Sequence, residues 1–107
     1  MKNIKYILPK HYAEVILRLS EKISVLAQQH EWEEARILET KRHQTMQALF
    51  SHPNINEALP SITSILHDVM ALDAEVMIKG ELELQEMALQ INGIGTGKRA
   101  VNAYLKT

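Results

Sequence analysis

The sequence has no cysteine, which excludes disulfide bonds and thiolate metal sites. It has only three prolines and four glycines among 107 residues, so long uninterrupted helices are permitted. No apolar run approaches the roughly 18 residues of a membrane span, and residues 1–8 lack the apolar core of a signal peptide. We therefore expect a cytoplasmic protein that has no membrane contact and no cofactor.

The chain length is sufficient for one hydrophobic core but not for two. The apolar share of 46% and the charged share of 23% are typical of a globular protein. We expect residues 1–107 to form a single all-α domain, an antiparallel three-helix bundle with a long third helix. A short fourth helix would follow a glycine hinge near residues 93–97.

The longest helix is predicted over residues 60–92, where Gly80 is the single interior helix breaker. Pro60 would open this helix, and Asn92-Gly93 would end it. Apolar residues at helical spacing form a continuous stripe that is expected to pack against the rest of the bundle. The stripe consists of Ile62, Ile65, Leu66, Val69, Met70, Leu72, Val76, Met77, Leu84, Met87 and Ile91.

Two shorter helices are predicted before it, over residues 10–29 and 32–50, with a tight turn between them and a loop over residues 51–59. Each has an apolar face at spacings of three and four residues. The inward-facing side chains are expected to be Tyr12, Val15, Ile16, Leu19, Ile23, Leu26 and Ala27 in the first helix, and Trp32, Ala35, Leu38, Met46, Leu49 and Phe50 in the second.

A second apolar row lies on the opposite side of the long helix and predicts a site for a partner. It consists of Ile78, Leu82 and Leu89, with Leu84 and Met87 near its other edge. Residues 98–107 form a basic tail that is too short to hold a helix alone, so it must dock to become ordered. We expect Val101, Tyr104 and Leu105 to cover the row as a regulatory tail.

Asp73 falls inside the apolar stripe, where a carboxylate needs a partner. Glu39 and Arg42 project from one face of the second helix, three residues apart. We expect Arg42 to form a structural ion pair with Glu39 or with Asp73.

Charge is unevenly distributed: residues 51–92 carry seven acidic groups and one basic group, whereas residues 93–107 carry three basic groups and no acidic group. An acidic long helix does not suit nucleic-acid binding. The five histidines include no pair at the spacing that places two metal ligands on one helical face. The segment Gly93-Ile-Gly-Thr-Gly-Lys-Arg departs from a phosphate loop, and helical chorismate mutases, which are similar in size, place their longest helix first. No enzyme activity is expected.

The order of these features resembles the FliT family of flagellar export chaperones. The matching stretches are Leu26-Ala-Gln-Gln-His-Glu-Trp-Glu, Glu39 to Arg42 with Leu49-Phe50, Leu72-Asp-Ala-Glu, and Gly97-Lys-Arg-Ala-Val-Asn-Ala-Tyr. Members often have a glycine and an acidic or polar residue before the tryptophan, where this chain has His30-Glu31.

The resemblance implies a cytoplasmic chaperone that binds the C-terminal helical segment of the filament-cap protein and delivers it to the export apparatus. It also implies further partners, such as the export ATPase or a flagellar transcription regulator. The alternative is a helical regulatory or structural protein that forms a stable oligomer, such as a homodimer, through the second apolar row and has no exported client. The two interpretations differ in their response to dilution, because a permanent dimer resists it.

Overall fold

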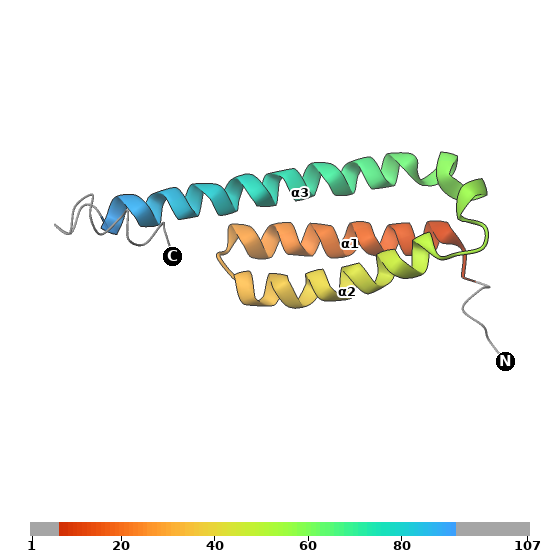
Figure 1. The fold of residues 1–107 in the computed structure, drawn as a ribbon, viewed down its shortest axis with the longest axis horizontal. Helices are drawn as coiled ribbons and strands as arrows, with labels where there is room; N and C mark the ends of the chain where they lie inside the picture. The colour runs from red at the N-terminus through yellow and green to blue at the C-terminus, as the bar shows by residue number, and fades with distance from the viewer. Residues whose placement is uncertain (1–6, 92–107) are drawn as a thin grey trace. The chain divides into compact units, whose positions relative to one another are not determined.

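The computed structural model describes residues 7–91, and within this range the protein has three α-helices and no strand (Figure 1). The helices are α1 (Pro9–Gln28), α2 (Trp32–Phe50) and α3 (Ile55–Ile91). The prediction of an all-α fold with a long third helix is confirmed. The hinge near residues 93–97 and the short helix over residues 98–107 lie outside the described residues.

The chain divides into two compact units, Met1–Val76 and Met77–Thr107, and α3 continues from the first unit into the second. The hydrophobic core lies in the first unit. It is built from Tyr12, Ala13 and Ile16 of α1, Leu49 of α2, and Ile62 and Val69 of α3. Because these side chains recur at helical spacing, each helix contributes one apolar face to a common interior.

The buried face of α1 agrees with its predicted apolar stripe, since Tyr12, Ile16, Leu19, Ile23 and Ala27 are all buried. The same face also buries two serines, Ser20 and Ser24, which hydrophobicity does not predict. The Ser20 hydroxyl donates a hydrogen bond to the carbonyl of Ile16 at 2.8 Å. A serine whose hydroxyl is satisfied within its own helix occupies little volume and incurs a small burial cost.

The turn between α1 and α2 is closed by a left-handed residue, His30, with a φ of 62°. The backbone N–H of Glu31 donates to the carbonyl of Leu26 at 2.8 Å, and the N–H of His30 donates to the carbonyl of Ala27 at 3.1 Å. These two bonds form a Schellman motif, in which the left-handed position usually belongs to glycine. The motif ends α1 and allows α2 to begin at Trp32, two residues after His30.

The start of α3 differs from the prediction, because the helix begins at Ile55 and Pro60 lies inside it. Pro60 has no N–H for the carbonyl four residues before it, and its ring disturbs the preceding turn. Two nearby hydroxyls bond to backbone carbonyls there: Ser61 donates to Ala58 at 2.8 Å, and Thr63 donates to Leu59 at 2.6 Å. Hydroxyl bonds of this kind accompany bent helices. Accordingly, the first turns of α3 run at an angle to the turns that follow (Figure 1).

The connection between α2 and α3 is shorter than the predicted loop over residues 51–59 and is anchored by His52, which is buried. Its Nδ1 accepts a hydrogen bond from the backbone N–H of Asn54 at 3.0 Å. Nε2 therefore carries the ring proton and donates to the carbonyl of Ile7, 2.9 Å away. The ring also meets the ring of Tyr12 edge-on. One side chain thus holds the loop against the beginning of α1.

Two side chains of the first unit that were expected to face inward are exposed, Phe50 and Met70. Each directly follows a buried residue, Leu49 and Val69 respectively. Neighbours in an α-helix point about 100° apart, so only one of each pair reaches the core. The predicted faces of α2 and α3 were therefore too wide.

Candidate functional site

The part of α3 that lies in the second unit, residues 77–91, exposes an apolar row that matches the expected partner site. Its three members are Ile78, Leu82 and Leu89, whose side chains are 58%, 50% and 70% exposed. They fall on one side of the helix when about 100° is assigned to each residue. Large aliphatic side chains grouped in this way typically mark a surface that another helix covers.

A second row, on nearly the opposite side of the same segment, consists of Met77, Leu84 and Met87, all of them exposed. The sequence placed these three residues in the packed stripe of the long helix, and their exposure shows that this part of the prediction was wrong. It also placed Leu84 and Met87 near the edge of the partner site, which stays a prediction. The reason for their exposure is helix length: α3 has 37 residues, whereas α1 has 20 and α2 has 19. At about 1.5 Å per residue, helices of that length cover only about half of α3. The apolar period of α3 therefore continues beyond the length that the other two described helices can cover.

Acidic residues lie along both apolar rows. Between residues 77 and 91 the chain has three glutamates, Glu81, Glu83 and Glu86, and one basic residue, Lys79. By the same helical rotation, Glu81 and Glu86 lie beside the row of Ile78, Leu82 and Leu89. Glu81 and Glu83 lie beside the row of Met77, Leu84 and Met87. The segment therefore combines apolar contact area with negative charge.

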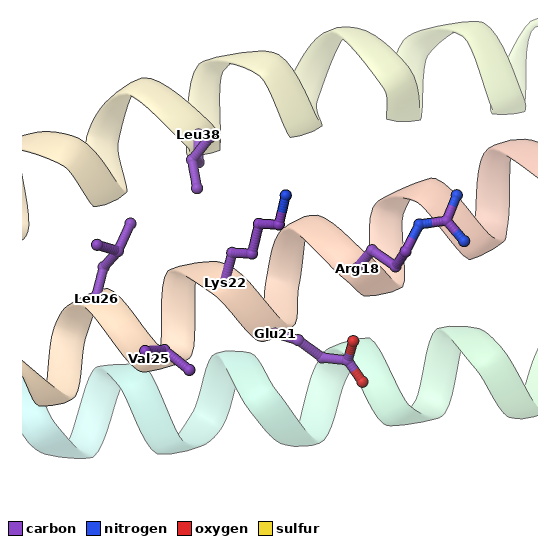
Figure 2. A pocket seen from close by; sticks show the side chains of 6 residues that line it. All are labelled: Arg18, Glu21, Lys22, Val25, Leu26 and Leu38. Atoms are coloured by element: carbon purple, nitrogen blue, oxygen red, sulfur yellow. The ribbon is translucent and has the colours of Figure 1, made fainter.

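An open groove of about 450 Å³ lies on the first unit, formed by α1 and α2 (Figure 2). Its lining residues are Arg18, Glu21, Lys22, Val25 and Leu26 of α1, and Leu38 of α2. Figure 2 shows Leu38 facing Leu26 and Lys22 across the space between the two helices. The groove was not predicted, because it results from the packing of α1 against α2.

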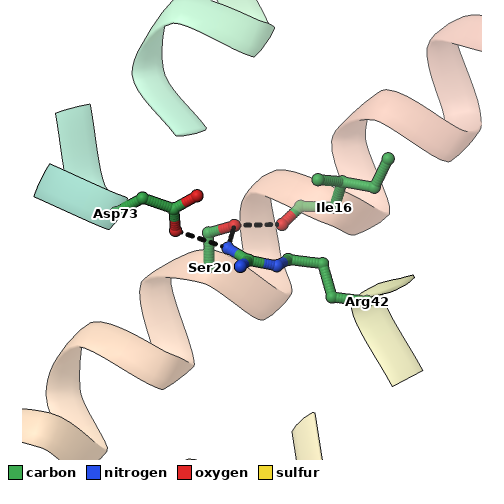
Figure 3. Close-up of polar contacts among 4 residues, drawn as sticks. All are labelled: Ile16, Ser20, Arg42 and Asp73. Atoms are coloured by element: carbon green, nitrogen blue, oxygen red, sulfur yellow. Dashed lines mark hydrogen bonds and ion pairs between the residues drawn. The ribbon is translucent and has the colours of Figure 1, made fainter. Parts of the chain in front are cut away.

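A polar cluster joins all three helices within the first unit (Figure 3). Arg42 of α2 donates through Nη1 to the Oγ of Ser20 at 2.9 Å and forms an ion pair with Oδ1 of Asp73 at 2.6 Å. The Arg42 side chain is 12% exposed and that of Asp73 is 40% exposed. Two carboxylates were predicted as possible partners of Arg42. The structure pairs Arg42 with Asp73, whereas Glu39 is exposed on α2.

Ser20 completes this cluster and was not among the residues predicted from the sequence. Its hydroxyl donates to Ile16 and accepts from Arg42, so both of its hydrogen-bonding roles are used. The sequence signal that could have identified it is a serine within the otherwise apolar stripe of α1, because a buried hydroxyl needs hydrogen-bond partners. The cluster contains no nucleophile aligned with a base, and we assign it a structural role.

Within residues 7–91, the structure has no group of three or more side chains suited to holding a metal ion. In the same range, no helix combines the length and apolar character needed to cross a membrane. The expected regulatory residues Val101, Tyr104 and Leu105 lie outside the described part of the chain.

Comparison with known proteins gave a match to one family model, described as flagellar protein FliT, over residues 10–106. Searches of curated proteins and of solved structures gave no match. The family match covers nearly the whole chain and confirms the resemblance seen in the sequence. FliT proteins are chaperones of flagellum biogenesis rather than enzymes, and they bind other flagellar proteins. This chain therefore belongs to the FliT family of flagellar export chaperones.

Proposed function

We propose that this protein is a cytoplasmic chaperone for the filament-cap protein, whose C-terminal helical segment it binds before export. The observation that carries this proposal is the exposed row of Ile78, Leu82 and Leu89 on a helix that extends beyond its core. Leu84 and Met87, which were also predicted near the edge of the partner site, are exposed on nearly the opposite side of the helix. An amphipathic helix that lays its apolar face on such a row would bury these side chains together with its own.

The energy available from this row is adequate for a transient complex. Full burial of one aliphatic side chain contributes about 1.5 to 3 kcal/mol, and part of this sum offsets the entropy lost on association. Three such side chains therefore support a contact of roughly micromolar strength. A contact of that strength suits a chaperone, because the client must be released at the export apparatus. The export ATPase or a flagellar transcription regulator would be a further partner.

The test of this proposal is the affinity of the purified protein for the C-terminal segment of the cap protein, measured by calorimetry. Leu82→Asp places a charge in the middle of the row and is expected to weaken binding at least about tenfold, which corresponds to ~1.4 kcal/mol. The bundle should remain folded because Leu82 is half exposed.

A matched control is Ile37→Asp, which changes an aliphatic side chain of α2 that is 68% exposed. This variant should bind the cap segment as the unaltered protein does. Equal weakening by both variants would show that the loss is non-specific. Unfolding of the Leu82→Asp variant would place the row in the core, and the proposed client site would be wrong.

The alternative is a permanently oligomeric protein without an exported client. Two measurements distinguish it from the chaperone proposal: the binding of the cap segment, and the oligomeric state of the protein after dilution. Failure to bind any cap segment, combined with an oligomer that persists on dilution, would favour it.

A further inference from the structure

The end of the first unit at which α1 begins exposes apolar side chains that have no role in the proposed client site. The start of α1 and the end of α2 lie side by side there (Figure 1), and Tyr12 of α1 shares the core cluster with Leu49 of α2. Next to these core residues, three large side chains are exposed: Ile7 at 37%, Leu8 at 68% and Phe50 at 53%. These three side chains form the apolar end of the unit. Exposed apolar side chains that are grouped in this way indicate a surface for binding.

A hydrogen bond holds the apolar end together. Nε2 of His52 donates to the carbonyl of Ile7 at 2.9 Å, and Phe50 precedes His52 by two residues. The bond therefore joins the segment of Ile7 and Leu8 to the end of α2. Pro9 follows directly and is buried. Leu8 is thus fixed on both sides along the chain, yet its side chain stays exposed.

The chain around the apolar end is basic. Residues 1–13 and 43–56 contain three lysines and no acidic residue, in a protein whose net charge is −1. The first acidic residues that follow these two ranges are Glu14 and Glu57. The lysines are Lys2, Lys5 and Lys10, of which Lys10 belongs to the described part of the chain and is exposed. Lysines beside exposed aliphatic and aromatic side chains are typical of proteins that bind to the surface of an anionic membrane.

We infer that this end of the first unit binds the surface of a membrane that contains anionic lipids. The lysines lie at the level of the negatively charged headgroups, and Leu8 and Phe50 reach the boundary of the acyl chains. An acidic protein surface would attract the lysines as well. The apolar side chains beside them favour a membrane, because an apolar medium lies directly beneath its anionic surface.

This inference goes beyond the client proposal, since it uses none of residues 77–91. It also differs from the expectation that the protein has no membrane contact. That expectation rested on the lack of an apolar run long enough to span a bilayer. A protein that binds to the membrane surface needs no such run.

The first experiment is flotation of the full chain with lipid vesicles on a density gradient. Vesicles of phosphatidylcholine and phosphatidylglycerol in equal parts should carry the protein upward. Vesicles of phosphatidylcholine alone should bind it at least about tenfold more weakly, because they lack the negative surface charge. Added salt should release the protein from the anionic vesicles by screening this attraction. Binding of equal strength to both kinds of vesicle, or to neither, would overturn the inference.

Two double variants separate the apolar and the electrostatic contributions. Leu8→Ser with Phe50→Ser removes two side chains of the apolar end, and Lys5→Glu with Lys10→Glu reverses two of the three lysines. Each variant should bind anionic vesicles at least about tenfold more weakly. Circular dichroism should show that the helices are retained, because the changed positions that the structure describes are exposed.

Matched controls make the same changes elsewhere on the first unit. Val25→Ser with Ile37→Ser removes two other exposed aliphatic side chains. Lys22→Glu with Lys41→Glu makes the same change in net charge at two exposed positions further along α1 and α2. Both controls should keep most of the binding to anionic vesicles.

Equal weakening by the test variants and their controls would show that only overall hydrophobicity or net charge matters, and would overturn the inference. Binding to soluble polyglutamate without binding to vesicles would also overturn it, and would assign the surface to an acidic protein. None of these outcomes bears on the binding of the cap segment, which is measured separately with Leu82→Asp.

Discussion

Arg42 is the side chain at which the three helices of the first unit are joined by polar contacts. Its Nη1 lies 2.9 Å from the hydroxyl of Ser20 in α1 and 2.6 Å from the carboxylate of Asp73 in α3. The arginine is largely buried, so its charge needs these partners. Asp73 is 40% exposed, and water therefore screens part of the ion pair. The cluster contributes more than a surface ion pair but less than a fully buried one.

We predict that Arg42→Ala lowers the free energy of unfolding by about 2 kcal/mol. The substitution removes two charge-assisted hydrogen bonds and the packing of the aliphatic stem, while solvent limits the cost of leaving Asp73 unpaired. Urea unfolding followed by circular dichroism measures the change. Lys41→Ala, at an exposed neighbouring position, is the control and should change stability little. If both variants unfolded at the same urea concentration, the cluster would have no structural importance.

At the scale of elements, the Schellman motif after α1 determines how tightly α1 and α2 can be joined. The motif requires a left-handed residue, and His30 adopts that conformation with a φ of 62°. A residue with a Cβ atom pays about 1 kcal/mol or more for this conformation, whereas glycine adopts it readily. His30 is thus a strained position that is held by the bonds around it.

We predict that His30→Gly raises the free energy of unfolding by about 0.5 to 1 kcal/mol, because relief of left-handed strain outweighs the added flexibility of the unfolded chain. Thermal and urea unfolding both report this change. Gln28→Gly is the matched control, since Gln28 is the last residue of α1 and has a helical backbone. That variant should lose up to about 1 kcal/mol. A loss of stability in both variants would contradict the assignment of strain to His30.

At the scale of the whole molecule, the protein keeps its core cluster in one unit, whereas the helical segment of the other unit exposes large apolar side chains on two sides. The core cluster is formed by residues between Tyr12 and Val69, whereas residues 77–91 expose six large apolar side chains. These six are Met77, Ile78, Leu82, Leu84, Met87 and Leu89. A segment of this composition needs a partner, and the basic residues of the chain's own tail, Lys98, Arg99 and Lys106, complement its acidic character.

We predict that deletion of residues 98–107 tightens binding of the cap segment and increases binding of a hydrophobic dye. The reason is competition: a tethered tail has a high effective concentration near the row, so its removal frees the row for the client. Calorimetry and dye fluorescence provide the two measurements. The control replaces Val101, Tyr104 and Leu105 with serine and keeps the length and charge of the tail. If neither change altered the two signals, the tail would have no regulatory role.

The amino-acid sequence by itself determined the first two helices and the presence of a long third helix, although α3 begins at Ile55 and not at the predicted residue 60. Residues 32–50 were predicted as the second helix, and α2 spans Trp32–Phe50. The first helix was predicted over residues 10–29, and α1 spans Pro9–Gln28. Both agree closely because helical period, proline and turn residues act over a few neighbouring positions. The family resemblance was likewise readable from local stretches and was confirmed by the family match.

Tertiary structure alone decided which parts of each apolar face are covered. Met70 and Phe50 have the hydrophobicity of core residues but lie one residue beyond the buried positions Val69 and Leu49. From the sequence, both Glu39 and Asp73 were possible partners of Arg42. The packing of α2 against α1 and α3 brings Arg42 to Asp73 and also to the hydroxyl of Ser20. The groove likewise exists only where α1 and α2 meet. These features depend on contacts between residues far apart in the chain, and a local period contains no information about the neighbour that a face will meet.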